Sequence, residues 1–98
     1  MTIEKKLTGE SATLIVSGRL DTQTAPELEN ELDSVLAGLK ELVFDFANLE
    51  YVSSAGLRVI LKAQKAMNMQ GSMKLTGVND SIMEVFDITV FLDILTIE

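Results

Sequence analysis

The first twenty residues contain two stretches whose apolar residues alternate with other residues. Residues 3–8 alternate between apolar positions, Ile3 and Leu7, and polar ones, which is typical of a half-buried strand. Residues 12–17 are apolar on both faces, which favours a central strand. Because only residues 9–11 separate them, we expect the two strands to pair as an antiparallel hairpin.

Three later segments repeat their apolar residues at helical spacing. Their predicted ranges are 25–37, 55–69 and 81–87, with buried stripes formed by Leu28, Leu32, Val35 and Leu36, by Leu57, Ile60, Leu61 and Met67, and by Ile82, Val85 and Phe86. Thr24 and Glu27 have the spacing of a capping box, and Pro26 suits a first turn. We therefore expect the first of these helices to begin just after Thr24.

Apolar runs at 41–46 and 72–76 predict two more strands, and the alternation at 94–97 predicts a fifth. Residues 88–93 fit either an extension of a strand or a buried turn. The element order is then β-β-α-β-α-β-α-β. Such an order predicts an α/β fold, with a mixed sheet, right-handed crossovers and helices packed on the sheet.

Composition fits one domain spanning residues 1–98, because 47% of the residues are hydrophobic and only 23% are charged. The net charge of −7 argues against nucleic acid as a partner. No apolar run approaches the roughly 20 residues that span a bilayer, and the first residues have no signal-peptide pattern. We expect a cytoplasmic protein without a membrane span.

The chain contains neither cysteine nor histidine, which removes thiolate chemistry and the commonest general base and metal ligand. A phosphate-binding Gly-x-x-x-x-Gly-Lys-Ser/Thr loop is also absent. Asp21 and Asp45 could form a carboxylate pair if they met at one end of the sheet, but no pocket for them is evident. We therefore expect no enzymatic activity, no catalytic residue, no cofactor and no metal.

The stretch 49–61 is the most informative part of the chain, because two hydroxyls and a glycine lie between a strand and a helix. The start of a helix has unpaired N–H groups and the positive end of the helix dipole. Ser53 and Ser54 could each cap the helix, or one of them could carry a phosphate held by those N–H groups. The residues alone leave both interpretations open.

A second loop, residues 21–24, also connects a predicted strand to a helix. In open α/β sheets, sites form where strand ends meet helix starts. We expect this loop and residues 53–56 to share one surface. Asp21 and Thr22 could then dock a partner, although Asp21 could equally serve only to close its own loop. Arg58 could pair with an acidic partner residue or simply face solvent.

The chain resembles the STAS family, and more narrowly the bacterial anti-sigma factor antagonists. The resemblance covers essentially the whole chain and is carried by the element order, Gly18-Arg19-Leu20-Asp21, Phe44-Asp45-Phe46 and Tyr51-Val52-Ser53-Ser54-Ala55-Gly56-Leu57. The family's stretch is typically Asp-Ser-Ser/Thr-Gly-Leu, with the first serine phosphorylated. The resemblance therefore implies that Ser54 is the phosphoacceptor, with Ser53 in place of the usual Asp and as the second candidate acceptor.

The resemblance also implies a partner and a switch. The unphosphorylated protein would bind an anti-sigma factor that is a GHKL-type serine kinase, and so free the sigma factor. Phosphorylation would abolish binding, and a serine phosphatase would restore it. The implied partner-binding residues are Asp21, Thr22, Ser53, Ser54, Ala55, Gly56 and Arg58. The serine in place of Asp keeps an alternative open, a STAS interaction module in a signalling or transport complex without a phosphorylation cycle.

Overall fold

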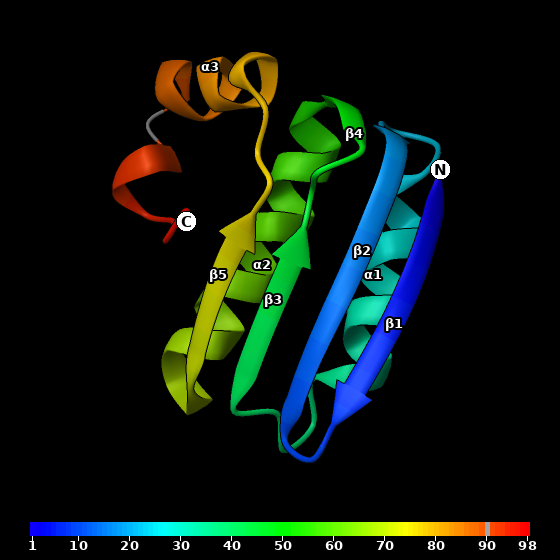
Figure 1. Ribbon diagram of the computed structural model, residues 1–98, viewed down its shortest axis with the longest axis vertical. Helices are drawn as coiled ribbons and strands as arrows, with labels where there is room; N and C mark the ends of the chain where they lie inside the picture. Colours follow the sequence, from blue (N-terminus) through cyan, green and yellow to red (C-terminus); the bar gives the residue numbers. More distant parts are fainter. Residues whose placement is uncertain (90) are drawn as a thin grey trace.

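The predicted hairpin at the start of the chain is present in the computed structural model, which describes residues 1–89 and 91–98. Strand β1 (Thr2–Thr8) pairs antiparallel with β2 (Ser11–Leu20). Leu14 and Val16 of β2 are fully buried, and Ile15 between them is half-buried, as expected of a central strand. Strand β1 is largely exposed and lies at the rim of the sheet (Figure 1).

Strands β3 (Glu41–Asp45) and β5 (Ser72–Thr76) extend the sheet in parallel, in the order β1-β2-β3-β5. Helices α1 (Ala25–Val35) and α2 (Ser54–Gln70) pack on one face of the sheet, as Figure 1 shows. Helix α3 (Asp80–Ile88) lies beyond the carboxyl ends of β3 and β5. The predicted α/β fold with a mixed sheet is therefore confirmed.

The core lies between the sheet and the two covering helices, and the predicted stripes supply much of it. Its largest fully buried side chains are Phe44, Phe46, Phe86, Leu14, Leu20, Leu28, Leu32, Leu42, Leu49, Ile60, Met67 and Leu75. Leu36 and Leu61, at the margins of their predicted stripes, are only half-buried. Among the described residues, no helix is both long and apolar enough to cross a bilayer.

One strand has no counterpart in the sequence prediction. Strand β4 (Leu49–Val52) pairs in parallel with the end of β2, where the sequence indicated only a loop. Its two buried residues, Leu49 and Val52, are three positions apart, with exposed residues between them. The pairing register also shifts between Gly18 and Arg19. The period-2 pattern that identifies a strand is consequently absent here.

The predicted strand at 94–97 is wrong. The chain instead forms a short 3₁₀ helix, η1 (Phe91–Asp93), and then touches β5 through a single bridge between Ile97 and Leu75. The alternating residues follow β5 for too short a distance to build a ladder. Of the ambiguous segment 88–93, Val90 lies outside the described residues.

Candidate partner-binding site at the starts of two helices

Strands β2 and β4 end side by side, and this brings the two candidate loops together. Leu20 is paired with Val52, and the Ser53 N–H donates a hydrogen bond to the Leu20 carbonyl at 2.8 Å. The loops that follow, residues 21–24 and 53–56, therefore begin at the same end of the sheet. The structure thus places Asp21 and Thr22 on the same end of the molecule as Ser53 and Ser54.

The two serines at the start of α2 have different positions. Ser53 is the N-cap residue, with an extended backbone, and its Oγ accepts a hydrogen bond from the Gly56 N–H at 3.3 Å. Ser54 is the first residue of the helix and is exposed. The capping role considered for both serines thus belongs to Ser53. Ser54 remains available at the solvent-facing start of the helix.

Gly56 is buried because α2 approaches the strand ends closely at this point. A Cβ atom at Gly56 would lie 2.6 Å from Leu20 Cγ and 3.0 Å from Val52 Cγ2. Both neighbours belong to the core, so there is little room for them to shift. The structure therefore gives Gly56 a packing role that positions Ser53 and Ser54. Its burial does not support the direct partner contact implied by the family resemblance.

Helix α1 begins just after Thr24, as predicted, but the turn before it is closed by reciprocal hydrogen bonds between Asp21 and Thr24. Asp21 Oδ1 accepts hydrogen bonds from the N–H groups of Gln23 and Thr24 at 3.0 and 3.1 Å. In return, Thr24 Oγ1 accepts one from the Asp21 N–H at 2.8 Å. The predicted capping box between Thr24 and Glu27 is wrong, because Thr24 has helical backbone angles and its hydroxyl is already engaged by the preceding turn.

These hydrogen bonds also set the charge state of Asp21. The Thr24 N–H lowers the pKa of the Asp21 carboxyl below its ordinary value of 3.8, against the opposing effect of desolvation. The Gln23 N–H, the Thr24 hydroxyl and the charge of Arg19 lower it further. Asp21 is thus held as a carboxylate, and the loop-closing role considered for it in the sequence is present.

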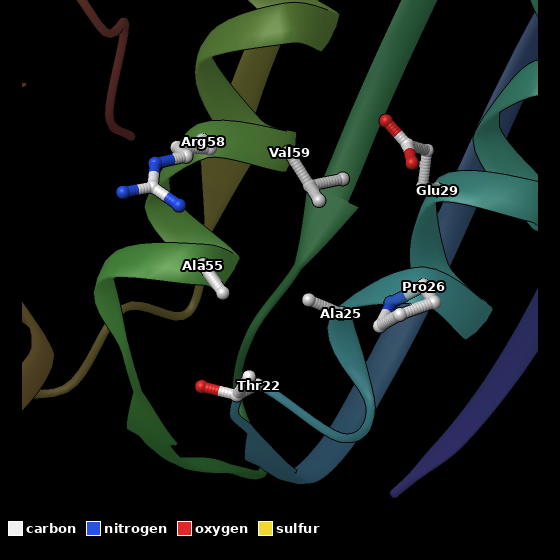
Figure 2. Close-up of a pocket in the computed structure, with 7 residues that line it drawn as sticks. All are labelled: Thr22, Ala25, Pro26, Glu29, Ala55, Arg58 and Val59. Atoms are coloured by element: carbon white, nitrogen blue, oxygen red, sulfur yellow. The ribbon is translucent and has the colours of Figure 1, made fainter.

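A shallow groove of about 230 Å³ separates the first turns of α1 and α2. Figure 2 shows Ala55 and Val59 on α2 across from Ala25 on α1, with Thr22 at the turn that leads into α1. The remaining lining residues are Pro26, Glu29 and Arg58. The floor is apolar and the rim is polar, which is the composition expected of a protein contact surface. Thr22, Ala55 and Arg58 of the predicted site therefore share one groove.

Two exposed ion pairs link the two helices beside this groove. Lys62 of α2 contacts Glu29 and Asp33 of α1, with N–O distances of 3.1 and 3.0 Å. Asp33 and then Glu29 raise the pKa of the Lys62 ammonium. Sequence reasoning missed these contacts because they join residues that are 33 and 29 positions apart in the chain. The predicted partner residue Arg58, one turn earlier in α2, is exposed, and Figure 2 shows its guanidinium directed away from α1.

The carboxylate pair considered for an enzyme is not formed. Asp45 lies opposite Ile15 in the parallel ladder between β2 and β3. Asp21 lies six residues beyond Ile15, a displacement of about 20 Å at the usual rise of a strand. The Asp45 carboxylate instead accepts a hydrogen bond from the Ala47 N–H at 3.0 Å. The two acids therefore serve separate turns.

Comparison with known proteins identifies the family to which this chain belongs. The STAS domain family matches residues 2–98. BtrV of Bordetella bronchiseptica, which is described provisionally as an anti-sigma factor antagonist, is 38% identical over 81 residues, covering 81% of this chain and 70% of BtrV. The anti-sigma-B factor antagonist of Staphylococcus aureus is 33% identical over 82 residues, covering 82% of this chain and 76% of that protein.

Solved structures show the same fold at lower sequence identity. The anti-sigma factor antagonist SpoIIAA in its unphosphorylated form superposes with a TM-score of 0.85 at 12% identity, covering 99% of this chain and 88% of SpoIIAA. An anti-sigma factor antagonist from Mycobacterium paratuberculosis gives a TM-score of 0.88 at 21% identity, covering 98% and 83%. The chain therefore belongs to the STAS domain family and, within it, to the anti-sigma factor antagonists.

Proposed function

We propose that this protein is a phosphorylation-controlled antagonist of an anti-sigma factor. Anti-sigma factor antagonists are regulators rather than enzymes, in agreement with the expectation from composition. In its unphosphorylated form, the protein binds an anti-sigma factor that is also a GHKL-type serine kinase, and the sigma factor is released. Phosphorylation of Ser54 ends the binding, and a serine phosphatase reverses it. The cycle takes place in the cytoplasm.

The observation that carries the proposal is the placement of Ser54. It is exposed on the first turn of α2, and its neighbour Ser53 supplies the cap. The first N–H groups of a helix have no partner within it, and they attract anions. A phosphate on Ser54 is thus compatible with the folded domain. SpoIIAA, which shares this fold, has been solved in both a phosphorylated and an unphosphorylated form.

The switch acts at the interface rather than on the fold. A phosphate on Ser54 adds almost two negative charges and considerable bulk next to Ala55, which lines the groove between α1 and α2. Misplaced like charge at an interface costs several kcal/mol. Since about 1.4 kcal/mol changes a dissociation constant tenfold, we expect at least a hundredfold loss of affinity. No unfolding is needed for a change of this size.

The first experiment compares wild type with Ser54→Glu as baits for affinity capture from the native lysate, identified by mass spectrometry. Ser81→Glu is the matched control, because Ser81 is also exposed in the first turn of a helix, α3. We expect wild type and Ser81→Glu to retain a GHKL-type kinase and Ser54→Glu to lose it. If all three retain the same non-kinase partners, the protein is a constitutive STAS interaction module.

Phosphopeptide mapping then tests the acceptor. Treatment with the captured kinase is expected to modify Ser54. Modification of Ser53 alone would contradict the assignment, because the hydroxyl that caps α2 would then be the acceptor.

The groove is tested by changing Thr22, which is exposed at the turn before α1 and lines the groove. Thr22→Arg places a long charged side chain at the contact and is expected to weaken kinase binding at least about tenfold. Gln23→Arg is the control, because Gln23 is the exposed neighbour outside the groove lining. Equal binding by both variants would remove Thr22 from the partner surface.

A further inference from the structure

The two edge strands of the sheet differ in whether another segment pairs with their outer backbone groups. At the β5 edge, the C-terminal segment covers the backbone of Leu75, whose N–H donates to Thr96 O and whose carbonyl accepts from the Glu98 N–H, both at 2.9 Å. At the other edge, β1 pairs with β2 and, within the described residues, with nothing else. Figure 1 shows β1 at the rim, with no element beyond it. An open edge of seven residues is a template for another strand.

The sequence of β1 is complementary to itself when a second copy runs antiparallel to it. With Lys5 on the two-fold axis, Glu4 lies opposite Lys6 of the second copy, and Ile3 lies opposite Leu7. Thr2 and Thr8 also face one another. Directly opposed residues in an antiparallel pair are in contact, and opposite charges and apolar pairs stabilise it. Each of these favourable pairs occurs twice, because a two-fold interface repeats every contact.

The exposure of these side chains fits that register. Leu7 is 61% exposed, which is unusual for a large apolar residue on a strand, and the register gives it Ile3 of the second copy as a partner. Ile3 itself is half-buried against the core, so both residues lie on the helix-covered side. Glu4 and Lys6 are exposed and form no salt bridge within residues 1–89 and 91–98.

Lysines on an edge strand usually oppose association between edges. In this register, each lysine of β1 has an acidic partner. Lys5, which would meet its own copy on the axis, already contacts Glu31 of α1 at 2.8 Å. Lys6 would meet Glu4. The charges of β1 therefore leave this one self-pairing favourable.

We propose that β1 is a dimerisation edge, pairing antiparallel with β1 of a second copy of this chain so that one sheet continues across the two-fold axis. The axis reverses the strand direction in the second copy. The two groove-and-serine sites therefore lie at opposite ends of the joined sheet. Each can bind its partner without obstructing the other.

The test is a charge swap followed by analytical ultracentrifugation at low salt over a wide concentration range. Wild type is expected to show a monomer–dimer equilibrium. Glu4→Lys sets lysine against lysine twice and is expected to raise the dissociation constant at least about tenfold. The double variant Glu4→Lys/Lys6→Glu restores both pairs and is expected to restore the dimer. Glu84→Lys, the same charge change at an exposed position of α3, is the control.

Hydrogen exchange provides the second measurement, because pairing protects the outward-facing amides of residues 2–8 only in the dimer. We expect slower exchange there at high protein concentration and no change at Glu84. A wild-type protein that stays monomeric at its highest soluble concentration would overturn the proposal. So would a dimer that responds equally to Glu4→Lys, the double variant and Glu84→Lys, since it would then use another surface.

Discussion

Helices α1 and α2 start at the same end of the sheet, but their first turns are closed in different ways. At α1, Asp21 Oδ1 accepts hydrogen bonds from two backbone N–H groups and Thr24 returns one, and Glu27 adds a negative charge. At α2, Ser53 accepts one longer hydrogen bond, and the first turn has no acidic residue. The start of α1 therefore already has carboxylate side chains beside it, whereas the first turn of α2 has none.

The difference bears on the proposed phosphorylation of Ser54. Negative charge near a helix start is favourable, and α1 obtains it from its own side chains. In α2 that place is open beside Ser54, which is exposed. A phosphate there would supply the missing charge, so the modified domain need not lose stability. The predictions below test this contrast through the packing and the caps of the two turns.

The largest effect is expected from Gly56→Ala. The new methyl group would overlap Leu20 and Val52, and overpacking of this kind costs about 1–3 kcal/mol of unfolding free energy. Chemical denaturation measures it, with Ser54→Ala as an exposed control in the same turn. In the Gly56→Ala background, Leu20→Ala should cost less than it does alone, because it makes room for the methyl. Strict additivity of the two changes would contradict the proposed contact.

The next effect tests the cap of α2. Ser53→Ala removes the hydrogen bond to the Gly56 N–H and is expected to cost about 1 kcal/mol. Thermal and urea denaturation would detect such a loss. Ser53→Asn keeps a capping oxygen and should retain most of the stability. An unchanged Ser53→Ala protein would mean that water satisfies this helix start equally well.

A smaller effect tests the missing charge. Ser53→Asp retains a capping oxygen and adds a carboxylate near the N-terminus of α2, where it should stabilise the protein by about 0.3–1 kcal/mol at low salt. The gain should shrink as salt is added, because the added charge is exposed to screening. Denaturation of both proteins at two salt concentrations measures it. A salt-independent gain would show that the added charge is not its source.

The smallest effect concerns pH at the start of α1. Because hydrogen bonds lower the pKa of Asp21 in the folded state, unfolding takes up a proton at pH values between that lowered pKa and the ordinary value of 3.8. The contribution of Asp21 is complete above that value and is lost as pH falls through the lower folded pKa. Asp21→Asn can keep the capping oxygen but does not titrate. Its stability should therefore fall less steeply than wild type in this acidic range, as measured by denaturation at several pH values.

Local patterns predicted the fold well, whereas contacts between distant segments escaped them. The stripes of α1 and α2 follow the helical period, so Leu28, Leu32 and Ile60 could be placed in the core. Strand β4 could not be recognised, because a register shift in its pairing with β2 breaks the period of two. At the C-terminus, the alternation predicted a strand that does not form, since the local pattern does not determine how far the segment follows β5.

The candidate site shows the same division. The proximity of residues 21–24 and 53–56 followed from the order of strands and helices, and the structure agrees. The roles of individual side chains could not be predicted in the same way. The spacing of Thr24 and Glu27 indicated a capping box, but in the structure Thr24 exchanges hydrogen bonds with Asp21 instead. The packing role of Gly56 likewise depends on Leu20, far away in sequence.

The two ion pairs of Lys62 also have a consequence for association kinetics. By joining Glu29 and Asp33 to α2, they favour the observed spacing of the two helices beside the groove before any partner arrives. A surface that is already arranged loses little conformational entropy on binding, and a larger fraction of encounters can be productive. Under the proposed switch, a partner released by phosphorylation of Ser54 would find the groove already arranged once the phosphate is removed, so rebinding would not wait for the site to reassemble.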